Sequence, residues 1–317
     1  SIDWNGIILD APSPAAAWTE IFAALLALSK ATSSPVALHD ATVVPDRLLA
    51  EAAWELWEAF PLQAETTADH LKAWAAADPA GKAVLILDAL SLRELPIILG
   101  AAETRGVEPV QVRVTGSACP STTDHFAKSL GLPGRSALAN NSKPGTLALV
   151  GGDWYTEVVG LPFADCAVPP SPNLLFWHTW LDDLIHLQKK LPDQVATIAA
   201  DTLQSDGFWG FLDRLRQGRN LVITSDHGYA VSKRFSSEVE DPEAIDILRT
   251  TFGASRNRAA GEPWQKRFMP PMVLTHNNQH VIMGQRKWKA PGGFPHLCHG
   301  GMSLLEVAVP FVEFPAR

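Results

Sequence analysis

The stretch LVITSDHG, residues 221–228, places a short apolar run directly before an aspartate, a histidine and a glycine. Such a run is typical of a strand that is buried on both faces, as in parallel sheets. Side chains just beyond the carboxyl end of such a strand face the crevice in which open α/β sheets bind ligands. Carboxylate oxygens and imidazole nitrogens are ligands of zinc and manganese. Taken alone, Asp226, His227 and Gly228 are more often a helix N-cap followed by a surface histidine.

The chain alternates strand-like and helical patterns from about residue 81 onward. Helical patterns cover residues 93–105 and 193–218. Strand-like runs are AVLILD, VEPVQVRVTG, TLALVGG, NLLFWHTW and, at the end, LLEVAVPFVEF. Strands that alternate with helices predict an α/β fold, with a mostly parallel central sheet flanked by helices on both faces.

Residues 1–80 are rich in Ala, Leu and Trp and follow a helical pattern instead. Three segments predict helices, namely WTEIFAALLALSK, DRLLAEAAWELWEAF and TTADHLKAWAAAD. We expect Pro45 at the entrance to the second helix and Pro61 just after its end. Trp54 and Trp57 are expected to pack in the interior rather than to stack on bases. The predicted organisation is a helical N-terminal segment at 1–80 and an α/β domain at 81–317.

Composition limits the class of protein. The chain has 317 residues, of which 46% are hydrophobic, enough for a large core. A net charge of −8 argues against a generally basic nucleic-acid binder, so an anionic substrate would need a local field. Cys119, Cys166 and Cys298 have neither disulfide nor zinc-knuckle spacing, which indicates a reducing compartment. Without a signal peptide or a membrane-length apolar run, we expect a cytoplasmic protein. The start at Ser1 without Met leaves open an excised piece of a longer protein.

Three further segments offer partners for the aspartate–histidine pair of the opening stretch. Asp88 follows the apolar run VLIL in the same strand-end position. Asp182 and His186 are four residues apart, which on a helix places both on one face. His299 precedes two glycines, which permit close approach of the backbone. The four segments together supply enough carboxylates and imidazoles for two divalent ions, and such a pair can stabilise the attacking and leaving oxygens of a phosphoryl transfer.

A hydroxyl nucleophile commonly accompanies a two-metal phosphoryl site. The stretch PSTTDHFAKSL offers Ser121, Thr122 and Thr123 at the start of a helix. Metal coordination would activate a hydroxyl there, and the helix N-terminus favours the charge of a phosphate. Ser and Thr are also ordinary N-caps, and the residues alone do not choose among the three hydroxyls.

The order of these motifs resembles the alkaline phosphatase superfamily. Within it, the chain most closely resembles the PglZ domain, found in bacterial phage-defence (BREX) systems and as an output domain of some response regulators. The most specific pieces are SDHGY and HGG-x-S-x-x-E-x-x-VP, and the resemblance covers roughly residues 81–317. Members of the superfamily hydrolyse phosphate monoesters and diesters, usually with zinc or manganese. Some PglZ domains resemble phosphodiesterases that act on oligonucleotides.

The resemblance implies a role for each candidate residue. Thr123 would be the nucleophile, because the P-S-x-T pattern of the superfamily places the reactive threonine last. The implied cofactors are two divalent metal ions, with zinc preferred over manganese. One metal would be held by Asp88, Asp226 and His227, and the other by Asp182, His186 and His299. Relatives often carry an acidic residue at the position of His186, so Asp183 and His178 are reserve ligands; we expect His178 to be a buried structural histidine.

Residues 253–290 carry a local positive charge that opposes the sign of the whole chain. Their cations, set against the single acid Glu262, are Arg256, Arg258, Lys266, Arg267, Arg286, Lys287 and Lys289. If this segment folds over the metals, Arg286 and Lys287 would contact phosphate and Trp288 would stack on a base. A solvated loop is the alternative. Arg135, which follows the nucleophile helix, is a further candidate for binding phosphate.

The residues and the resemblance together predict a two-metal phosphoesterase. We expect a phosphodiesterase that acts on nucleotide, cyclic-nucleotide or nucleic-acid substrates, in phage defence or signalling. One alternative is a phosphomonoesterase or phosphomutase that uses the same site. The other is a non-catalytic metal-binding scaffold of a bacterial defence complex, with protein partners held by the first helices. No membrane partner is expected.

Overall fold

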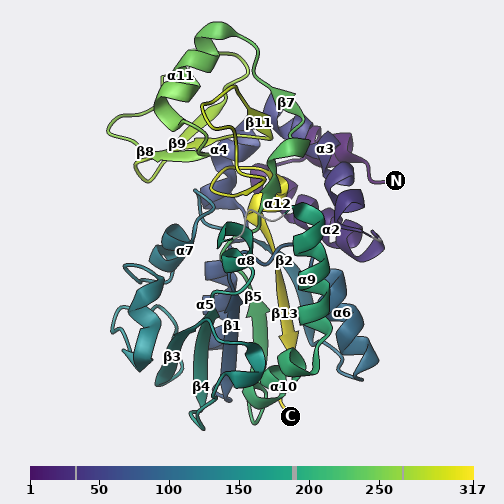
Figure 1. Ribbon diagram of the computed structural model, residues 1–317, viewed down its shortest axis with the longest axis vertical. Helices are drawn as coiled ribbons and strands as arrows, with labels where there is room; N and C mark the ends of the chain where they lie inside the picture. Colours follow the sequence, from purple (N-terminus) through teal and green to yellow (C-terminus); the bar gives the residue numbers. More distant parts are fainter. Residues whose placement is uncertain (33, 188–190, 266–267) are drawn as a thin grey trace.

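The computed structural model of the protein describes residues 1–32, 34–187, 191–265 and 268–317 (Figure 1). Its centre is a six-stranded sheet in which only the last strand of the chain runs antiparallel to its neighbours. The strands, in spatial order, are β2 (Gln111–Gly116), β13 (Ala308–Phe314), β5 (Asn220–Thr224), β1 (Lys82–Leu87), β4 (Asn173–His178) and β3 (Trp154–Val159). The predicted mostly parallel sheet is therefore confirmed.

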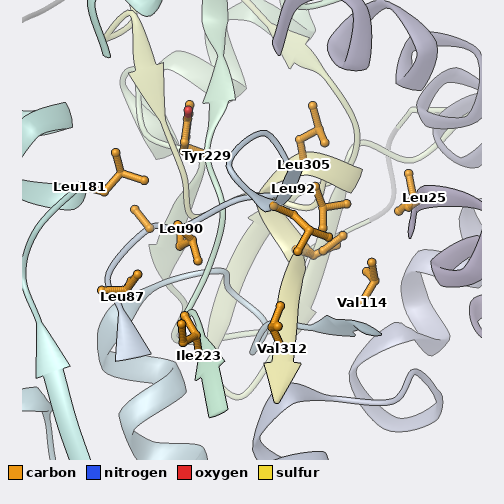
Figure 2. Close-up of a cluster of buried hydrophobic side chains, with 14 of the residues drawn as sticks. Leu25, Leu87, Leu90, Leu92, Val114, Leu181, Ile223, Tyr229, Leu305 and Val312 are labelled. Carbon is orange, nitrogen blue, oxygen red and sulfur yellow. The ribbon is translucent and has the colours of Figure 1, made fainter. Parts of the chain in front are cut away.

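Both faces of the sheet are covered because the central strands are mostly apolar and almost entirely buried. All six residues of β1 are buried. Val84 and Ile86 belong to one hydrophobic cluster, which also contains side chains of α5 (Thr67–Ala77) and α7 (Thr123–Ser129). Leu85 and Leu87 belong to another, which also draws on α2 (Pro14–Ala31), α6 (Leu95–Thr104) and α10 (Asp206–Leu215). Figure 2 shows part of this second cluster, in which Leu87 of β1, Ile223 of β5, Val312 of β13 and Val114 of β2 all contribute side chains.

The first helices are broken differently from the prediction. They are α1 (Trp4–Leu9), α2, α3 (Pro35–Glu51), α4 (Trp54–Gln63) and α5. Pro45 lies inside α3, because this helix already begins at Pro35, where the Ser34 hydroxyl accepts a hydrogen bond from the Ala37 N–H. Pro61 lies inside α4. The single helix expected over residues 46–60 is therefore wrong, since the chain breaks at residues 52–53.

Two other expected elements differ in the structure. The run TLALVGG is not a strand; the edge strand β3 starts only at Trp154, after Gly151 and Gly152, which both adopt a positive φ of 110°. The helical stretch at 193–218 is two helices, α9 (Pro192–Gln204) and α10, separated at Ser205. The Ser205 hydroxyl caps α10 by accepting a hydrogen bond from the Phe208 N–H. Residues 304–307, expected to be strand, form the short helix α12 (Leu304–Val307) ahead of β13.

A small subdomain sits beyond one end of the sheet (Figure 1). Its three-stranded sheet has the order β8 (Asn257–Ala259), β10 (Gln279–Ile282) and β9 (Val273–His276). The helix α11 (Pro242–Phe252) packs on this sheet through a cluster that includes Leu248 and Trp288. The remaining short elements are α8 (Asp182–Leu187), η1 (Arg135–Asn141), η2 (Phe163–Asp165), η3 (Ser232–Arg234), β6 (Ala230–Val231), β7 (Ser237–Glu238), β11 (Arg286–Lys287) and β12 (Leu297–Cys298).

The N-terminal helices share the core of the sheet. The cluster that contains Leu85 also contains Trp18 and Trp57, whose rings lie 4.9 Å apart. Trp57 is fully buried, as expected of a packing residue. The division of the chain near residue 80 falls between α5 and β1 and stays a prediction. Within the part of the chain that the structure describes, no helix has the length and apolarity needed to cross a bilayer.

Candidate metal centre

The carboxyl ends of two neighbouring strands bring two aspartates together. β1 and β5 pair in parallel, with Ile86 opposite Thr224, so the residues that follow them leave the same edge of the sheet. Asp88 follows β1, Asp226 and His227 follow β5, and all three residues are fully buried. The residues that the sequence places at the ends of two strands therefore lie together at one edge of the sheet.

The Thr123 hydroxyl points into this group. Its Oγ1 lies 2.6 Å from Oδ2 of Asp226, and 3.4 Å from both Oδ1 of Asp88 and Nε2 of His227. The other two candidate hydroxyls are engaged elsewhere. Ser121 donates to the Gly301 carbonyl at 2.7 Å, and Thr122 is bonded to Nδ1 of His125 at 2.7 Å. Of the three hydroxyls at this helix start, only that of Thr123 therefore contacts the buried aspartates.

Backbone groups orient the first set of possible ligand atoms. Oδ1 of Asp226 accepts hydrogen bonds from the N–H groups of Ala89 and His227, each at 3.0 Å, which turns Oδ2 toward the centre. Nδ1 of His227 donates to the Gly228 carbonyl at 2.7 Å, so Nε2 carries the free lone pair. This Nε2 lies 3.3 Å from Oδ2 of Asp226 and 3.7 Å from Oδ1 of Asp88.

Gly228 is required by a close approach of two backbone segments. Its N–H donates to the Glu306 carbonyl at 2.7 Å, and a Cβ at this position would overlap the Leu305 carbonyl oxygen. Gly300 and Gly301 are constrained in the same way, because a Cβ there would collide with the side chains of Asn257 and Arg256. Gly228 therefore lets the segment at Leu305 and Glu306 lie against the end of β5, and Gly300 and Gly301 leave room for the side chains of Asn257 and Arg256.

A second set of possible ligand atoms lies on α8 and in the loop before α12. Oδ1 of Asp182 is 3.0 Å from Nε2 of His186 and 3.7 Å from Nε2 of His299. The two histidine Nε2 atoms are 3.3 Å apart. Nδ1 of His299 donates to the Ser121 carbonyl at 3.0 Å, which leaves its Nε2 free. The contact thus joins His299 to the segment that leads into α7.

The two sets are contiguous. Asp182 joins them, because single ligand atoms of Asp88, Asp182 and His227 all lie within 4.8 Å of one another, as do those of Asp182, His186 and His299. We call the six residues Asp88, Asp182, His186, Asp226, His227 and His299 the six-residue cluster. The structure brings together every residue that the sequence interpretation assigned to a metal.

The electrostatics of the six-residue cluster suit bound cations. Burial, reinforced by the neighbouring Asp226, raises the pKa of Asp88 well above its usual range, and burial raises the pKa of Asp226 to about 6. Oδ1 of Asp182 is buried and faces the ring nitrogens of His186 and His299, at 3.0 and 3.7 Å. Burial lowers the pKa of His299 to about 3, so its imidazole is uncharged. Buried acceptor atoms that face one another need a proton or a cation between them, and this donor set is one that zinc or manganese accepts.

Two donors contact Asp88 from outside the cluster. Nη1 of the partly exposed Arg135 lies 2.6 Å from Oδ2 of Asp88, and Nε1 of Trp177 donates to the same oxygen at 3.0 Å. Arg135 was a sequence candidate for phosphate, and it lies at the edge of the site. Trp177 was missed, because only the register of β4 against β1 places its indole beside Asp88.

The basic segment 253–290 is mostly occupied by its own packing. Arg286 is buried and donates to the carbonyls of Met283 and Ala50, so its guanidinium does not reach the six-residue cluster. Trp288 is 2% exposed and donates to the Gly253 carbonyl, which rules out base stacking as it stands.

Other cations of this segment differ in their surroundings. Arg256 forms a buried ion pair with Glu306 at 2.7 Å. Lys287 lies in β11 opposite Glu238 of β7 and is partly exposed. Arg258 and Lys289 are exposed. Lys266 and Arg267 lie outside the described residues. The expectation that this segment presents Arg286 and Trp288 to a substrate does not match their burial.

The reserve ligands lie outside the cluster. Nε2 of His178 is bonded to the Leu161 carbonyl at 2.7 Å, and its Nδ1 accepts a hydrogen bond from the Trp180 N–H, as expected of a structural histidine. The Asp183 carboxylate accepts a hydrogen bond from Thr179 at 2.6 Å.

Comparison with known proteins adds similarities of fold only. No family model matches the sequence, and no curated protein matches it significantly. The structure is similar to that of phosphonoacetate hydrolase from Sinorhizobium meliloti 1021 in complex with phosphonoacetate, with 15% identity over 75% of this chain and 91% of that chain and a TM-score of 0.41. It is also similar to murine ectonucleotide pyrophosphatase/phosphodiesterase 5, with 14% identity over 75% of this chain and 88% of that chain and a TM-score of 0.45. TM-scores below 0.5 carry no argument about activity, so the function is inferred from the site.

Proposed function

We propose that this protein is a phosphoesterase that holds two divalent metal ions and uses Thr123 as its nucleophile. One observation carries the proposal: the Thr123 hydroxyl lies within 3.4 Å of Asp88, Asp226 and His227, at the start of a helix and at the carboxyl edge of a parallel sheet. Open α/β sheets bind ligands at this edge, and a helix start favours the negative charge of a phosphate.

The residues that would hold the metals are those of the six-residue cluster. Asp88, Asp226 and His227 would bind one ion, and Asp182, His186 and His299 the other, with zinc preferred and manganese second. When bound, the ions would supply positive charge that offsets the charge developing on the phosphoryl oxygens. His186 is the most exposed of these residues and stands where relatives often carry an acid, so its contribution is the first to test.

The side chains of the site suit a two-step displacement. Oγ1 of Thr123 would form a bond to phosphorus while the bond from phosphorus to the leaving-group oxygen breaks. The hydroxyl already donates to Oδ2 of Asp226, so that carboxylate is positioned to accept the proton. Arg135, at the edge of the site, would contact a phosphoryl oxygen once substrate competes for its pairing with Asp88. Water would then cleave the phosphothreonine and restore the hydroxyl.

We further propose a phosphodiester or nucleotide substrate and a place in the PglZ branch of the alkaline phosphatase superfamily. The support is the sequence resemblance in SDHGY and HGG-x-S-x-x-E-x-x-VP, together with the exposed cations Arg258 and Lys289 on the neighbouring subdomain. A cytoplasmic role in phage defence or signalling, with protein partners from such a system, is part of the same proposal. A phosphomonoesterase or phosphomutase activity and a non-catalytic scaffold are outcomes that the following experiment separates.

The test compares hydrolysis of bis-p-nitrophenyl phosphate and p-nitrophenyl phosphate with added zinc or manganese. We expect faster hydrolysis of the diester, and a loss of about 10³-fold or more for Thr123→Ala, as is usual when a nucleophile is removed. Thr104→Ala, the same change on the surface of α6, is the matched control. Preference for the monoester would support the monoesterase, and activity that survives in Thr123→Ala would refute the assigned nucleophile. Bound metal without turnover of these esters, short nucleic acids or cyclic nucleotides would support the scaffold.

A further inference from the structure

A separate cavity of about 530 Å³ lies at the starts of α3 and α9. Its third wall is the segment 229–234, which follows His227 in the chain. Its volume falls within the range of small-molecule sites, roughly 300–1,000 Å³. None of its lining residues belongs to the six-residue cluster.

The lining of this cavity is positively charged. Arg93, Lys233 and Arg234 face it against one acid of the lining, Asp193. Arg234 is paired with Asp40 at 3.0 Å, whereas Lys233 has no ion pair with any described residue. The imbalance favours an anionic occupant in a chain whose overall charge is negative.

Two buried polar atoms in the lining have no hydrogen-bond partner among the described residues. Nη1 of Arg93 donates to the Tyr229 carbonyl at 2.6 Å, but its Nη2 has no acceptor, although Arg93 is only 6% exposed. Nε2 of His39 is bonded to the Arg234 carbonyl at 3.1 Å, but its Nδ1 is unpaired, and His39 is 3% exposed. A buried polar group without a hydrogen bond destabilises the folded protein. A bound ligand that pairs with these two atoms would therefore be stabilised.

The two unpaired atoms need opposite partners. The guanidinium of Arg93 needs an acceptor such as a phosphate or carboxylate oxygen. Burial, together with the charge of Arg93, lowers the pKa of His39 to about 4, so its imidazole is neutral at pH 7. Because its Nε2–H donates to a carbonyl, Nδ1 is an acceptor and needs a donor such as a hydroxyl group.

Two helix starts add to the positive potential of the cavity. The 17-residue helix α3 begins at Pro35 and the 13-residue helix α9 begins at Pro192. Ser34 and Pro35 line the cavity from one side, and Leu191 and Pro192 from the other. The positive ends of both helix dipoles therefore face the same space.

An apolar extension continues the cavity. A second cavity of about 240 Å³ shares the lining residues Ser34, Pro35, Arg93 and Ala196 with the first. Its further walls include the side chains of Leu38, Leu92 and Ile97. An occupant with an apolar part can place it there while its charged group stays beside Arg93.

We propose that this cavity binds a small organic anion, a phosphate ester or a carboxylate, whose body carries a hydroxyl donor and an apolar part. This site goes beyond the proposed phosphoesterase function and does not depend on it. The cavity is close to the metal centre along the chain, since its lining residue Tyr229 follows His227 by two residues. The Tyr229 carbonyl accepts the hydrogen bond from Arg93.

The test is calorimetric titration of the full chain with AMP and with 4-hydroxyphenylacetate, as purified and again after treatment with EDTA. These probes separate a phosphate source from a carboxylate source, and adenosine is the uncharged control. We expect at least one anion to bind under both conditions. Lys233→Gln should weaken binding about tenfold, the scale of a lost charge-assisted hydrogen bond. Ala196→Trp, which fills the junction of the two cavities, should abolish it, and Lys143→Gln on a distant turn should leave it unchanged.

Every result bears on the proposal. Binding of AMP alone identifies a phosphate ester, and binding of 4-hydroxyphenylacetate alone identifies a carboxylate; either supports the site. Absence of binding by both anions overturns it, as does binding that Lys233→Gln leaves intact. Lys233 is exposed, so this variant stays informative if Ala196→Trp folds poorly. Because binding is measured without turnover, failure here leaves the test of the phosphoesterase untouched.

Discussion

The imidazole rings of His227 and His299 stack with their centroids 3.7 Å apart and their planes 14° apart. The first histidine follows β5 and the second precedes α12, so the stack ties the strand-end aspartates to the group on α8. Two charged rings would repel each other at this separation. Burial, reinforced by the neighbouring His227, lowers the pKa of His299 to about 3, which keeps its Nε2 free to bind a metal.

Removal of metal is expected to destabilise the protein. The six-residue cluster holds three carboxylates in a site where Asp88 and Asp226 are fully buried, and a bound cation would compensate their charge. At a metal concentration of about 100 times Kd, the stabilisation is about 2.7 kcal/mol, or roughly 4 °C in Tm for a chain of this size. Differential scanning calorimetry with EDTA, zinc and manganese measures it. Equal Tm values under all three conditions would argue against a metal centre.

Loss of one histidine is expected to remove one metal. His299→Ala deletes a possible ligand of the set on α8 but none of the strand-end set, so bound zinc should fall from about two ions per chain to about one. Elemental analysis of the purified protein gives the count. His276→Ala, in β9 and outside both ligand sets, is the control. A count that His299→Ala does not change would exclude the proposed assignment of this residue.

Trp177→Phe is expected to weaken the site without unfolding the chain. The indole donates to Oδ2 of Asp88, and its ring packs edge-on against Phe126 with centroids 5.6 Å apart. Phenylalanine keeps the packing but removes the donor. Loss of such a supporting contact to a metal ligand typically costs about 10–100-fold in metal affinity or activity. Zinc titration and diester hydrolysis measure both, and Tm reports the fold.

Trp154→Phe is the matched control for that experiment, because Trp154 is buried in the neighbouring strand β3 and its Nε1 has no partner among the described residues. It should leave zinc affinity unchanged. Equal loss in both variants would mean that general packing, rather than the bond to Asp88, matters at Trp177.

The sequence was enough to predict those site residues that directly follow strands of the central sheet. Asp88 and Asp226 could be paired in advance, because apolar strands in a parallel sheet finish at one edge. Trp177 could not, since its place beside Asp88 depends on the register between β4 and β1. Arg286 was misjudged because local charge does not reveal that a guanidinium will be buried against α3 and bonded to backbone carbonyls. The residues alone do not distinguish Thr123 from Ser121 and Thr122, because only the folded structure shows that these two hydroxyls are bonded elsewhere.

Gly228→Ala is expected to destabilise the fold strongly. An added Cβ would overlap the Leu305 carbonyl oxygen, and backbone on both sides would have to move. Such overpacking typically costs about 1–3 kcal/mol, and we expect the upper end here. Gly100→Ala is the matched control, because the added Cβ of this helical glycine in α6 would meet no atom within 4 Å beyond its own helix backbone and chain neighbours. That variant should be stabilised by roughly 0.5–1 kcal/mol. Urea unfolding measures both, and a neutral Gly228→Ala would contradict the close approach.

Asp46→Asn is expected to flatten the pH dependence of stability. Asp46 on α3 is buried, and its carboxylate accepts hydrogen bonds from the Leu304 N–H and the Gln285 side chain, each at 2.9 Å. Burial raises its pKa to about 7. Between about pH 4 and pH 7 the folded state therefore keeps a proton that the unfolded state has lost. The free energy of unfolding should fall as pH rises through this window, by roughly 3 kcal/mol from Asp46.

Asparagine at position 46 cannot titrate, and its side chain can form hydrogen bonds with the same neighbours as Asp46. Oε1 of Gln285 has no partner among the described residues, so rotation of that amide would let it accept a hydrogen bond from the new side chain. Burial also raises the pKa of Glu94 to about 7, so the slope between pH 4 and pH 7 should be reduced rather than abolished. Urea unfolding at pH 5.0 and 7.5 measures the slope, with Asp40→Asn on the exposed face of α3 as the control. An unchanged slope in Asp46→Asn would mean that Asp46 is ionised in the folded protein throughout this range.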